Sequence, residues 1–226
     1  MKFFFPYLLF PFFIWAETSL YQINLQKYFN SGVDQNALSE SALAKKGDFA
    51  IGSLSSDEAV FIRYDGNSYK VTKGGALQKV DEKEGIAIAN AILFQPAKHF
   101  DVGAANTFVK LDQEILPHFD SQNIPYAILI TGTFNHIKLN STYSKQKPDL
   151  FELNDIKGSL VGFWMPSSLS GIAFDKFHFH FISQDRKKGG RVIEVSSAKG
   201  IGAITPIFNL NLEFPKTKEF LNARIN

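Results

Sequence analysis

The amino-acid sequence predicts a single α+β unit, of mixed α/β composition, built mainly from β-sheet. Three observations lead to this prediction: short runs of β-branched and aromatic residues recur along the chain, glycine-containing turn signals separate them, and a single stretch has a clear helical period. The chain has 226 residues, 45% of them hydrophobic, which is enough for a large core. Because it has no cysteine, it is not a disulfide scaffold, and any metal ion would need histidine and oxygen ligands.

Residues 1–16 form an apolar segment that differs from the rest of the chain. Lys2 precedes an apolar run that ends at Trp15, and the small residue Ala16 follows. The run has about 13 residues, fewer than the roughly 20 that a membrane span needs. This pattern is typical of a secretory signal peptide cleaved near Ala16, and it predicts export to the periplasm or outside the cell, with no stable membrane span in the remaining domain, residues 17–226. A short membrane anchor is the alternative.

Segment 47–79 predicts an antiparallel meander of short strands. Its strand-like runs lie at 48–54, 59–64 and 68–71. The Asp65-Gly66 pair between the last two runs is typical of a tight hairpin turn. The apolar run 86–94 that follows is compatible with a strand or with a short helix, because so short a run has no period that distinguishes them.

The middle of the chain predicts one helix followed by two strands. Apolar residues spaced by three and four indicate an amphipathic helix between 106 and 119. These residues are Phe108, Leu111, Ile115 and Phe119. The run 126–134 is typical of a buried strand with a bend at Gly132, and 135–140 alternates like a half-exposed strand. A polar, lysine-rich loop occupies 141–149.

The carboxy-terminal third predicts three further strands, at 158–164, 171–183 and 192–197. A turn is expected between the last two, at Lys187-Lys188-Gly189-Gly190. These runs complete a mainly β fold.

His178 and His180 are the strongest chemical signal in the sequence. In the run FHFHF they fall on one face of the predicted strand and the three phenylalanines on the other, since side chains alternate along a strand. Two imidazoles about 7 Å apart on one face can converge on a metal ion. A half-exposed strand with two surface histidines above a phenylalanine core has the same pattern. The return strand offers Arg191 and no clear third ligand, because arginine keeps its proton.

The charge of the chain is close to balanced. Lys and Arg number 24 against 22 Asp and Glu, for a formal net charge of +2. Nucleic acid is therefore not expected as a partner.

Several segments together resemble the α-acetolactate decarboxylase family. They are GDFAIGSL, NIPYAILITGTFNHIK, GSLVGFWMPSSLSGIAF, FHFHFISQDRKKGGRV and LEFPKTKEF, in matching order and spacing. The resemblance spans nearly all of residues 17–226 and implies two associated mixed β-sheets with few helices, in a protein that is often a homodimer. The implied activity is removal of CO₂ from 2-acetolactate, a 2-hydroxy-3-oxo acid, to give acetoin. The resemblance also implies a zinc ion held by three histidines, which would stabilise the enolate left by CO₂.

The resemblance assigns roles to single residues as well. His178 and His180 match the first two zinc ligands, and Arg191 stands where the family has the third. Arg191 is thus a candidate for binding a substrate carboxylate. The family's acidic residue falls on Val60, so Glu58, two positions earlier, is a candidate catalytic residue.

Three residues of the strand 135–140 complete the candidate set. The family's substrate-holding arginine falls on Asn140, which becomes a candidate substrate-binding residue. Lys138, on the same face as Asn140, is the second candidate catalytic residue. His136 is the candidate replacement for the third zinc ligand.

The sequence leaves two functions open. One is an exported acetolactate decarboxylase whose zinc is held by the histidine pair and a third group. The other is a non-catalytic relative that binds a small oxo or hydroxy acid through Arg191 and the histidines, without a metal ion.

Overall fold

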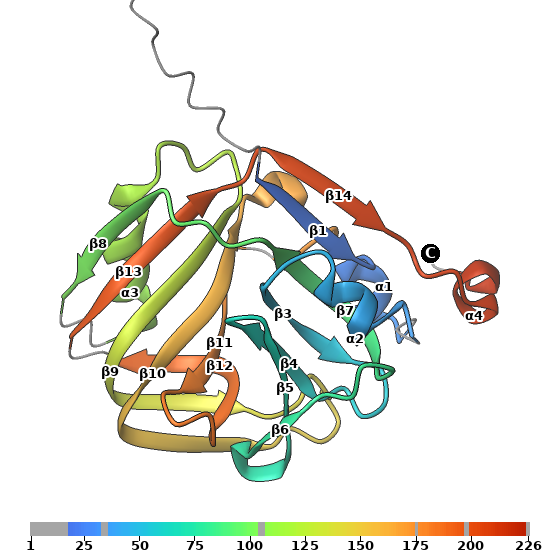
Figure 1. Ribbon diagram of the computed structural model, residues 1–226, viewed down its shortest axis with the longest axis horizontal. Helices are drawn as coiled ribbons and strands as arrows, with labels where there is room; N and C mark the ends of the chain where they lie inside the picture. Colours follow the sequence, from blue (N-terminus) through green and yellow to red (C-terminus); the bar gives the residue numbers. More distant parts are fainter. Residues whose placement is uncertain (1–17, 33–35, 104–106, 175, 197–198, 225–226) are drawn as a thin grey trace, which may run out of the picture.

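Two β-sheets with a few short helices make up the protein, as seen in the computed structural model of Figure 1. The structure describes residues 18–32, 36–103, 107–174, 176–196 and 199–224. The predicted α+β class is confirmed. Segment 1–16, predicted to be a signal peptide, lies outside the described residues. Within them, no helix combines the length and the apolar character that crossing a membrane requires.

The first sheet has eight strands and contains the predicted meander. Its strands are β1 (Ser19–Ile23), β2 (Leu38–Ser39), β3 (Phe49–Leu54), β4 (Val60–Tyr64), β5 (Asn67–Val71), β6 (Leu77–Lys79), β7 (Gly85–Ile92) and β14 (Asn209–Glu213). Their order is β14-β1-β7-β3-β4-β5-β6, with β2 paired to β7. β3 to β6 pair antiparallel in chain order, which confirms the meander, and the run 86–94 is a strand, β7. Asp65 and Gly66 form the hairpin turn with left-handed φ values of 52° and 70°.

The second sheet has six strands, four of which close into a ring. The strands are β8 (Lys98–Val102), β9 (Tyr126–Asn140), β10 (Leu150–Met165), β11 (Lys176–Ser183), β12 (Gly189–Ser196) and β13 (Lys199–Pro206). β10 pairs with both β9 and β11, and β12 pairs with the same two strands, so β9 to β12 surround a common interior. The predicted strands 126–134 and 135–140 are one strand, because β9 continues through Gly132 and pairs with β10 along almost its full length.

The helices are short. They are α1 (Gln26–Asn30), α2 (Glu40–Ala44), α3 (Phe108–Ile115) and α4 (Lys218–Asn222). α1 and α2 contact β7 of the first sheet, while α3 packs against β8 and β12 of the second. α3 is the predicted amphipathic helix, but it is shorter than the predicted range 106–119. Thr107 caps its start by accepting a hydrogen bond from the backbone N–H of Lys110 at 3.2 Å, and a 3₁₀ turn with Pro117 follows its end, since proline has no backbone donor.

Other parts of the predicted pattern differ from the structure. Gly189 and Gly190 are the first residues of β12 and not part of a turn, which lies instead at 184–187. There the hydroxyl of Ser183 accepts hydrogen bonds from the amides of Lys187 and Lys188. The predicted strand 171–183 begins only at Lys176, as β11. The pattern did not predict β1, β8, β13 and β14, because they are short or partly exposed and give weak alternation.

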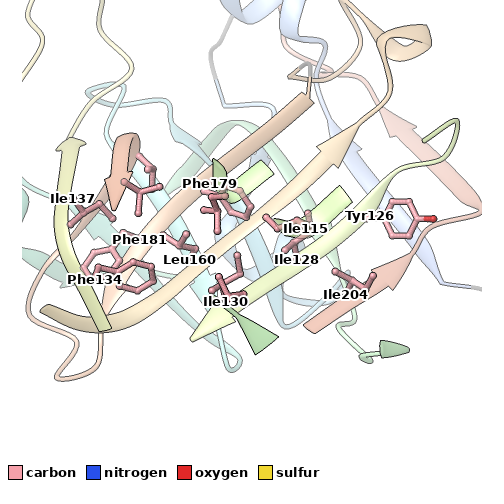
Figure 2. Packing of buried hydrophobic residues seen from close by; sticks show 14 of the residues in the cluster. Ile115, Tyr126, Ile128, Ile130, Phe134, Ile137, Leu160, Phe179, Phe181 and Ile204 are labelled. Carbon is pink, nitrogen blue, oxygen red and sulfur yellow. The ribbon is translucent and has the colours of Figure 1, made fainter. Parts of the chain in front are cut away.

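The two faces of β11 have different surroundings. Phe179 and Phe181 are buried in a cluster to which all four strands of the ring contribute, seen in Figure 2 together with Ile137 and Leu160. The opposite face carries His178 and His180 and is directed toward the first sheet. The predicted division of this strand into a phenylalanine face and a histidine face is confirmed, and it places the histidine pair between the two sheets.

Candidate ligand-binding site

The hydroxyl of Tyr143 lies between the two histidines. Its oxygen is 2.6 Å from Nε2 of His178 and 2.8 Å from Nε2 of His180. Tyr143 comes from the lysine-rich loop 141–149, between β9 and β10, and reaches the histidine face of β11 from outside that strand. One oxygen atom is therefore shared by both imidazoles.

The second ring nitrogen of His180 fixes the direction of these hydrogen bonds. Nδ1 of His180 lies 2.9 Å from the backbone carbonyl oxygen of Phe61 on β4, which can only accept, so Nδ1 carries the proton. In neutral His180, Nε2 is then an acceptor and receives the Tyr143 hydroxyl proton. Because that hydroxyl has a single proton, His178 donates its own Nε2–H to the Tyr143 oxygen.

All three groups of this cluster are neutral at pH 7. Burial, and secondarily the charge of Arg191, lowers the pKa of His178 to about 3. Burial, followed by the neighbouring His178, holds the pKa of His180 well below its usual value. Burial also raises the pKa of Tyr143 far above its usual value, against a smaller opposite effect of Arg191. The positive charge beside the cluster belongs to Arg191.

Arg191 lies directly opposite His180 in the pairing of β11 with β12. Its guanidinium carbon is 5.2 Å from the centroid of the Tyr143 ring, which is a cation–π distance. Its Nε is buried and has no hydrogen-bond partner among the residues that the structure describes. A buried, unpaired donor is costly, so this arrangement favours a ligand that accepts a hydrogen bond from Arg191.

A cavity of about 560 Å³ opens beside the cluster. It is lined by Phe29, Asn30, Gly32, Glu58, Tyr143, Ser144, Lys145, Gln146, Phe174, His178 and Arg191. Phe174 stacks on His178, with 4.3 Å between the two ring centroids. Phe174 and Phe29 together form an apolar side of the cavity. His180 is fully buried and is not part of the lining, because Tyr143 covers it.

Glu58, a candidate catalytic residue from the sequence, lines this cavity. It does not belong to a strand, although the sequence had suggested one. It lies in the connection between β3 and β4, with a left-handed φ of 52°. Its backbone carbonyl accepts hydrogen bonds from the amide of Tyr143 at 2.8 Å and from the hydroxyl of Thr142 at 3.1 Å. Glu58 thus fixes the position of the Tyr143 loop through its backbone, and it is one of the residues that line the cavity.

The structure does not bring the candidates of strand β9 to the cavity lining. Asn140 is buried, and its side-chain oxygen accepts hydrogen bonds from the amides at both ends of the loop, Thr142 and Asp149. Lys138 forms an ion pair with Glu194, with 3.7 Å between Nζ and Oε1. His136 lies 3.3 Å from Glu152, away from the histidine pair. Asn140 therefore has a clear structural role, in holding the loop that carries Tyr143.

The residues present do not fit a three-histidine zinc centre. Across the described ranges, no group of three or more His, Cys, Asp or Glu side chains is arranged to hold a metal ion. The third position is Arg191, which does not ligate metals, and the point between the two Nε2 atoms is taken by the Tyr143 hydroxyl. The two histidines and Tyr143 instead form a hydrogen-bonded polar cluster beside the positively charged Arg191.

Tyr143 is the central residue that the sequence reasoning missed. The available signal was that it is the single aromatic residue in an otherwise polar loop, STYSKQKPD. An aromatic residue in such a loop usually packs against the body of the protein.

Comparison with known proteins identifies the family to which the chain belongs. The model of one family, described as Alpha-acetolactate decarboxylase, matches residues 20–226. The chain belongs to the alpha-acetolactate decarboxylase family. The resemblance noted from the sequence segments is thereby confirmed.

Individual members of the alpha-acetolactate decarboxylase family are moderately similar to this chain. The alpha-acetolactate decarboxylase of Bacillus licheniformis is 28% identical over 218 residues, which cover 92% of this chain and 86% of that protein. The enzyme of Methanosarcina mazei is 29% identical over 223 residues, covering 93% and 77%. The match to the family therefore extends over nearly all of the described fold.

Solved structures agree with this assignment. The crystal structure of alpha-acetolactate decarboxylase from Bacillus subtilis strain 168 superposes with a TM-score of 0.87 and 26% identity, covering 92% of this chain and 94% of that one. A protein of unknown function similar to alpha-acetolactate decarboxylase, from Staphylococcus aureus, has a TM-score of 0.86 at 22% identity, with the same coverage, and shares the fold. The predicted fold of two associated sheets with few helices is confirmed, but only the first sheet is mixed, through its parallel β1–β14 pair, whereas the second is antiparallel throughout its described strands.

Proposed function

We propose that this family member binds a small 2-hydroxy-3-oxo acid, or a closely related oxo acid, by its carboxylate beside Arg191 and without zinc. The observation that carries the proposal is the buried Nε of Arg191, which lacks a hydrogen-bond partner among the described residues and belongs to a residue of the cavity wall. A guanidinium offers a planar fork of donors that matches a carboxylate.

The rest of the cavity suits a small acid. Its lining has two positive side chains, Lys145 and Arg191, against one carboxylate, Glu58. The apolar side formed by Phe29 and Phe174 suits the methyl groups of a short branched acid. His178 and the backbone and side chains of the loop supply further polar contacts for keto and hydroxyl oxygens.

Decarboxylation of 2-acetolactate is the second candidate, and the match of the family model over residues 20–226 favours it. In that reaction the bond to the carboxyl carbon breaks, CO₂ leaves, and the electron pair forms an enolate that is then protonated to acetoin. Arg191 is the cation beside the histidine pair that would stabilise the enolate oxygen here. Removing a single electrostatic stabiliser from such a site costs about 10²- to 10³-fold in rate, so we expect activity well below that of a complete site.

Calorimetric titration of the purified chain with 2-acetolactate tests both candidates, with acetoin formation followed in the same samples. Acetoin itself, which lacks the carboxylate, is the matched ligand control. We expect 2-acetolactate to bind and acetoin to bind at least about 10-fold more weakly, since the ion pair is lost. Arg191→Gln should abolish the preference for the acid, and Arg186→Gln, whose side chain stacks on Tyr64 outside this cavity, should not. Equal binding of the two ligands overturns the proposal.

Rapid acetoin formation by a protein that retains one equivalent of zinc would favour the second candidate over the first. Binding of 2-acetolactate without turnover by a zinc-free protein is the outcome expected from the first.

We propose that the mature protein is exported. The support is the pattern of residues 1–16, with Lys2, an apolar run and a small residue at Ala16. Amino-terminal sequencing of the protein recovered from the periplasm or medium should begin at Glu17. Recovery of the intact chain from the membrane fraction would instead indicate an uncleaved anchor.

A further inference from the structure

The hydroxyl of Tyr143 stands where a metal ion shared by His178 and His180 would stand. It is within hydrogen-bond distance of both Nε2 atoms, at 2.6 and 2.8 Å, and so uses the lone pair of one and the proton of the other. Zinc–nitrogen bonds are about 2.0 to 2.1 Å long, so an ion bonded to both nitrogens would overlap the phenol oxygen. The ion and the hydroxyl are therefore mutually exclusive.

The loop that carries Tyr143 is fixed at several points. The amide of Tyr143 donates to the carbonyl of Glu58 at 2.8 Å. Asp149, at the other end of the loop, accepts from the hydroxyl of Ser141 at 2.6 Å and from the amide of Gly74 at 2.7 Å. Asn140 joins both ends, as described above. The Tyr143 ring is held as well, because its centroid lies 5.5 Å from that of Phe29 and 5.7 Å from that of Phe174. With both the backbone and the ring in contact with other segments, Tyr143 is a fixed component of the site rather than a swinging side chain.

The positive charge of Arg191 also disfavours a metal ion at the histidine pair. The guanidinium of Arg191 lies over the Tyr143 ring and stands opposite His180 in the strand pairing. A divalent cation held by the two histidines would meet this positive charge at close range, in surroundings largely shielded from water. The histidine pair thus keeps the geometry of a metal site while both of its neighbours disfavour the ion.

We infer that the Tyr143 hydroxyl permanently replaces the metal ion in this chain, and that Tyr143 and Arg191 together exclude divalent cations from the His178–His180 pair. The inference deepens the proposed zinc-free acid binding and rests on the same site. Because two side chains, Tyr143 and Arg191, are held responsible for excluding the ion, the inference predicts that substituting both creates a zinc site.

Zinc content after dialysis, and competition with a chromophoric chelator, test the inference independently of activity. The wild-type chain should retain no zinc. Tyr143→Ala alone leaves two histidines and the arginine, and Arg191→His alone leaves the hydroxyl in place, so each should bind zinc weakly. The double variant should bind one equivalent, at least about 100-fold more tightly than either single variant, since three imidazoles then converge on a free position.

Two further measurements keep the test decisive. Adding His178→Ala to the double variant should abolish the gain, and cobalt bound to the double variant should have the visible absorption of a tetrahedral site. If the double variant does not fold, Tyr143→Phe with Arg191→His is the substitute, because it keeps the ring and removes the oxygen. Retention of one zinc by the wild-type chain, lost in His178→Ala, overturns the inference. Tight binding by Arg191→His alone also overturns it, because Tyr143 would then be no obstacle.

These outcomes separate the inference from the proposed function. A wild-type chain that excludes zinc but fails to distinguish 2-acetolactate from acetoin supports the inference and refutes acid binding. A chain that binds the acid and also retains zinc refutes the inference and the zinc-free part of the proposed function, and it leaves acid binding at Arg191 standing.

Discussion

The side-chain hydroxyl of Tyr143 lies closer to Nε2 of His178, at 2.6 Å, than to the fully buried His180, at 2.8 Å, and it screens His180 from the cavity. The loop and the strand that supply these groups are separated by 35 residues between Tyr143 and His178. The contact therefore ties the loop 141–149 to the centre of the second sheet, and the cluster contributes to stability as well as to the site.

Tyr143→Phe should lower the free energy of unfolding by about 2 to 6 kcal/mol, because it leaves two buried imidazole nitrogens without a partner at about 1 to 3 kcal/mol for each. Urea denaturation at pH 7 measures the change. Tyr69→Phe is the matched control, since Tyr69 is only half-buried and keeps its ring contact with Lys79 as phenylalanine. Equal effects of the two substitutions would contradict the structural role of the hydroxyl.

Asp149→Asn should destabilise the protein at pH 7 and have little effect in acid. The hydroxyl of Ser141 and the amide of Gly74 hold the pKa of Asp149 below its usual value. A carboxyl whose pKa is lower in the folded state stabilises the fold above its unfolded pKa, and this stabilisation is lost as the pH falls through the folded pKa. We expect a loss of about 1 kcal/mol at pH 7, since the site is near the surface.

Thermal unfolding of wild type and Asp149→Asn between pH 3 and 7 checks this dependence. The difference between the two proteins should begin to shrink below the ordinary aspartate pKa of about 3.9 and disappear only as the pH falls through the lower pKa of folded Asp149. A difference independent of pH would mean that the charge of Asp149 is not what holds the loop.

Asp112→Asn should stabilise the protein at neutral pH. Burial in α3 raises the pKa of Asp112 to about 6, against a smaller opposite effect of Lys176, and Oδ1 of Asp112 has no hydrogen-bond partner in the described part of the chain. A carboxyl whose pKa is higher in the folded state contributes most below its unfolded pKa and loses that contribution as the pH rises through the folded value.

The expected gain is about 1 to 2 kcal/mol at pH 7.5, after allowing for the partial exposure of Asp112, and near zero at pH 4. Thermal unfolding at the two pH values measures it. Glu114→Gln, at an exposed position of the same helix, is the control. A larger gain at pH 4 than at pH 7.5 would reverse the sign argued here.

Phe179→Ala should cost about 3 to 5 kcal/mol of stability, because the ring is almost fully buried in the cluster of Figure 2 and its loss leaves a cavity. Phe208→Ala is the control, since Phe208 is 68% exposed and should change stability by less than about 0.5 kcal/mol. Guanidinium denaturation compares the two. Similar midpoints for both variants would show that the phenylalanine face does not anchor the histidine strand.

Much of the fold was predictable because its signals are local. Alternation with period two placed His178 and His180 opposite Phe179 and Phe181, and the structure has the same division. The turn at Asp65-Gly66 and the meander around it followed from residues that favour a left-handed turn between apolar runs. The resemblance of several segments added the family.

The element boundaries were less predictable, for physical reasons. Gly189 and Gly190 suggest a turn by composition, yet strand pairing with β11 extends through them, and Ser183 instead organises the turn before them. β9 is one strand and not two, because pairing with β10 carries it through Gly132. Hydrogen bonds to a distant strand outweigh local preference in both places.

By itself the sequence determined the family, the sheet-rich fold and the strand face on which two histidines stand, since these depend on periodicity and on residue patterns along the chain. Only the tertiary structure decided what meets those histidines. The loop 141–149 has no periodicity, and its course is set by hydrogen bonds to Asn140 directly before it and to Glu58 and Gly74, which lie elsewhere in the sequence. These contacts bring the Tyr143 hydroxyl to the histidine pair, and they change a candidate metal site into a polar cluster beside a cavity of about 560 Å³.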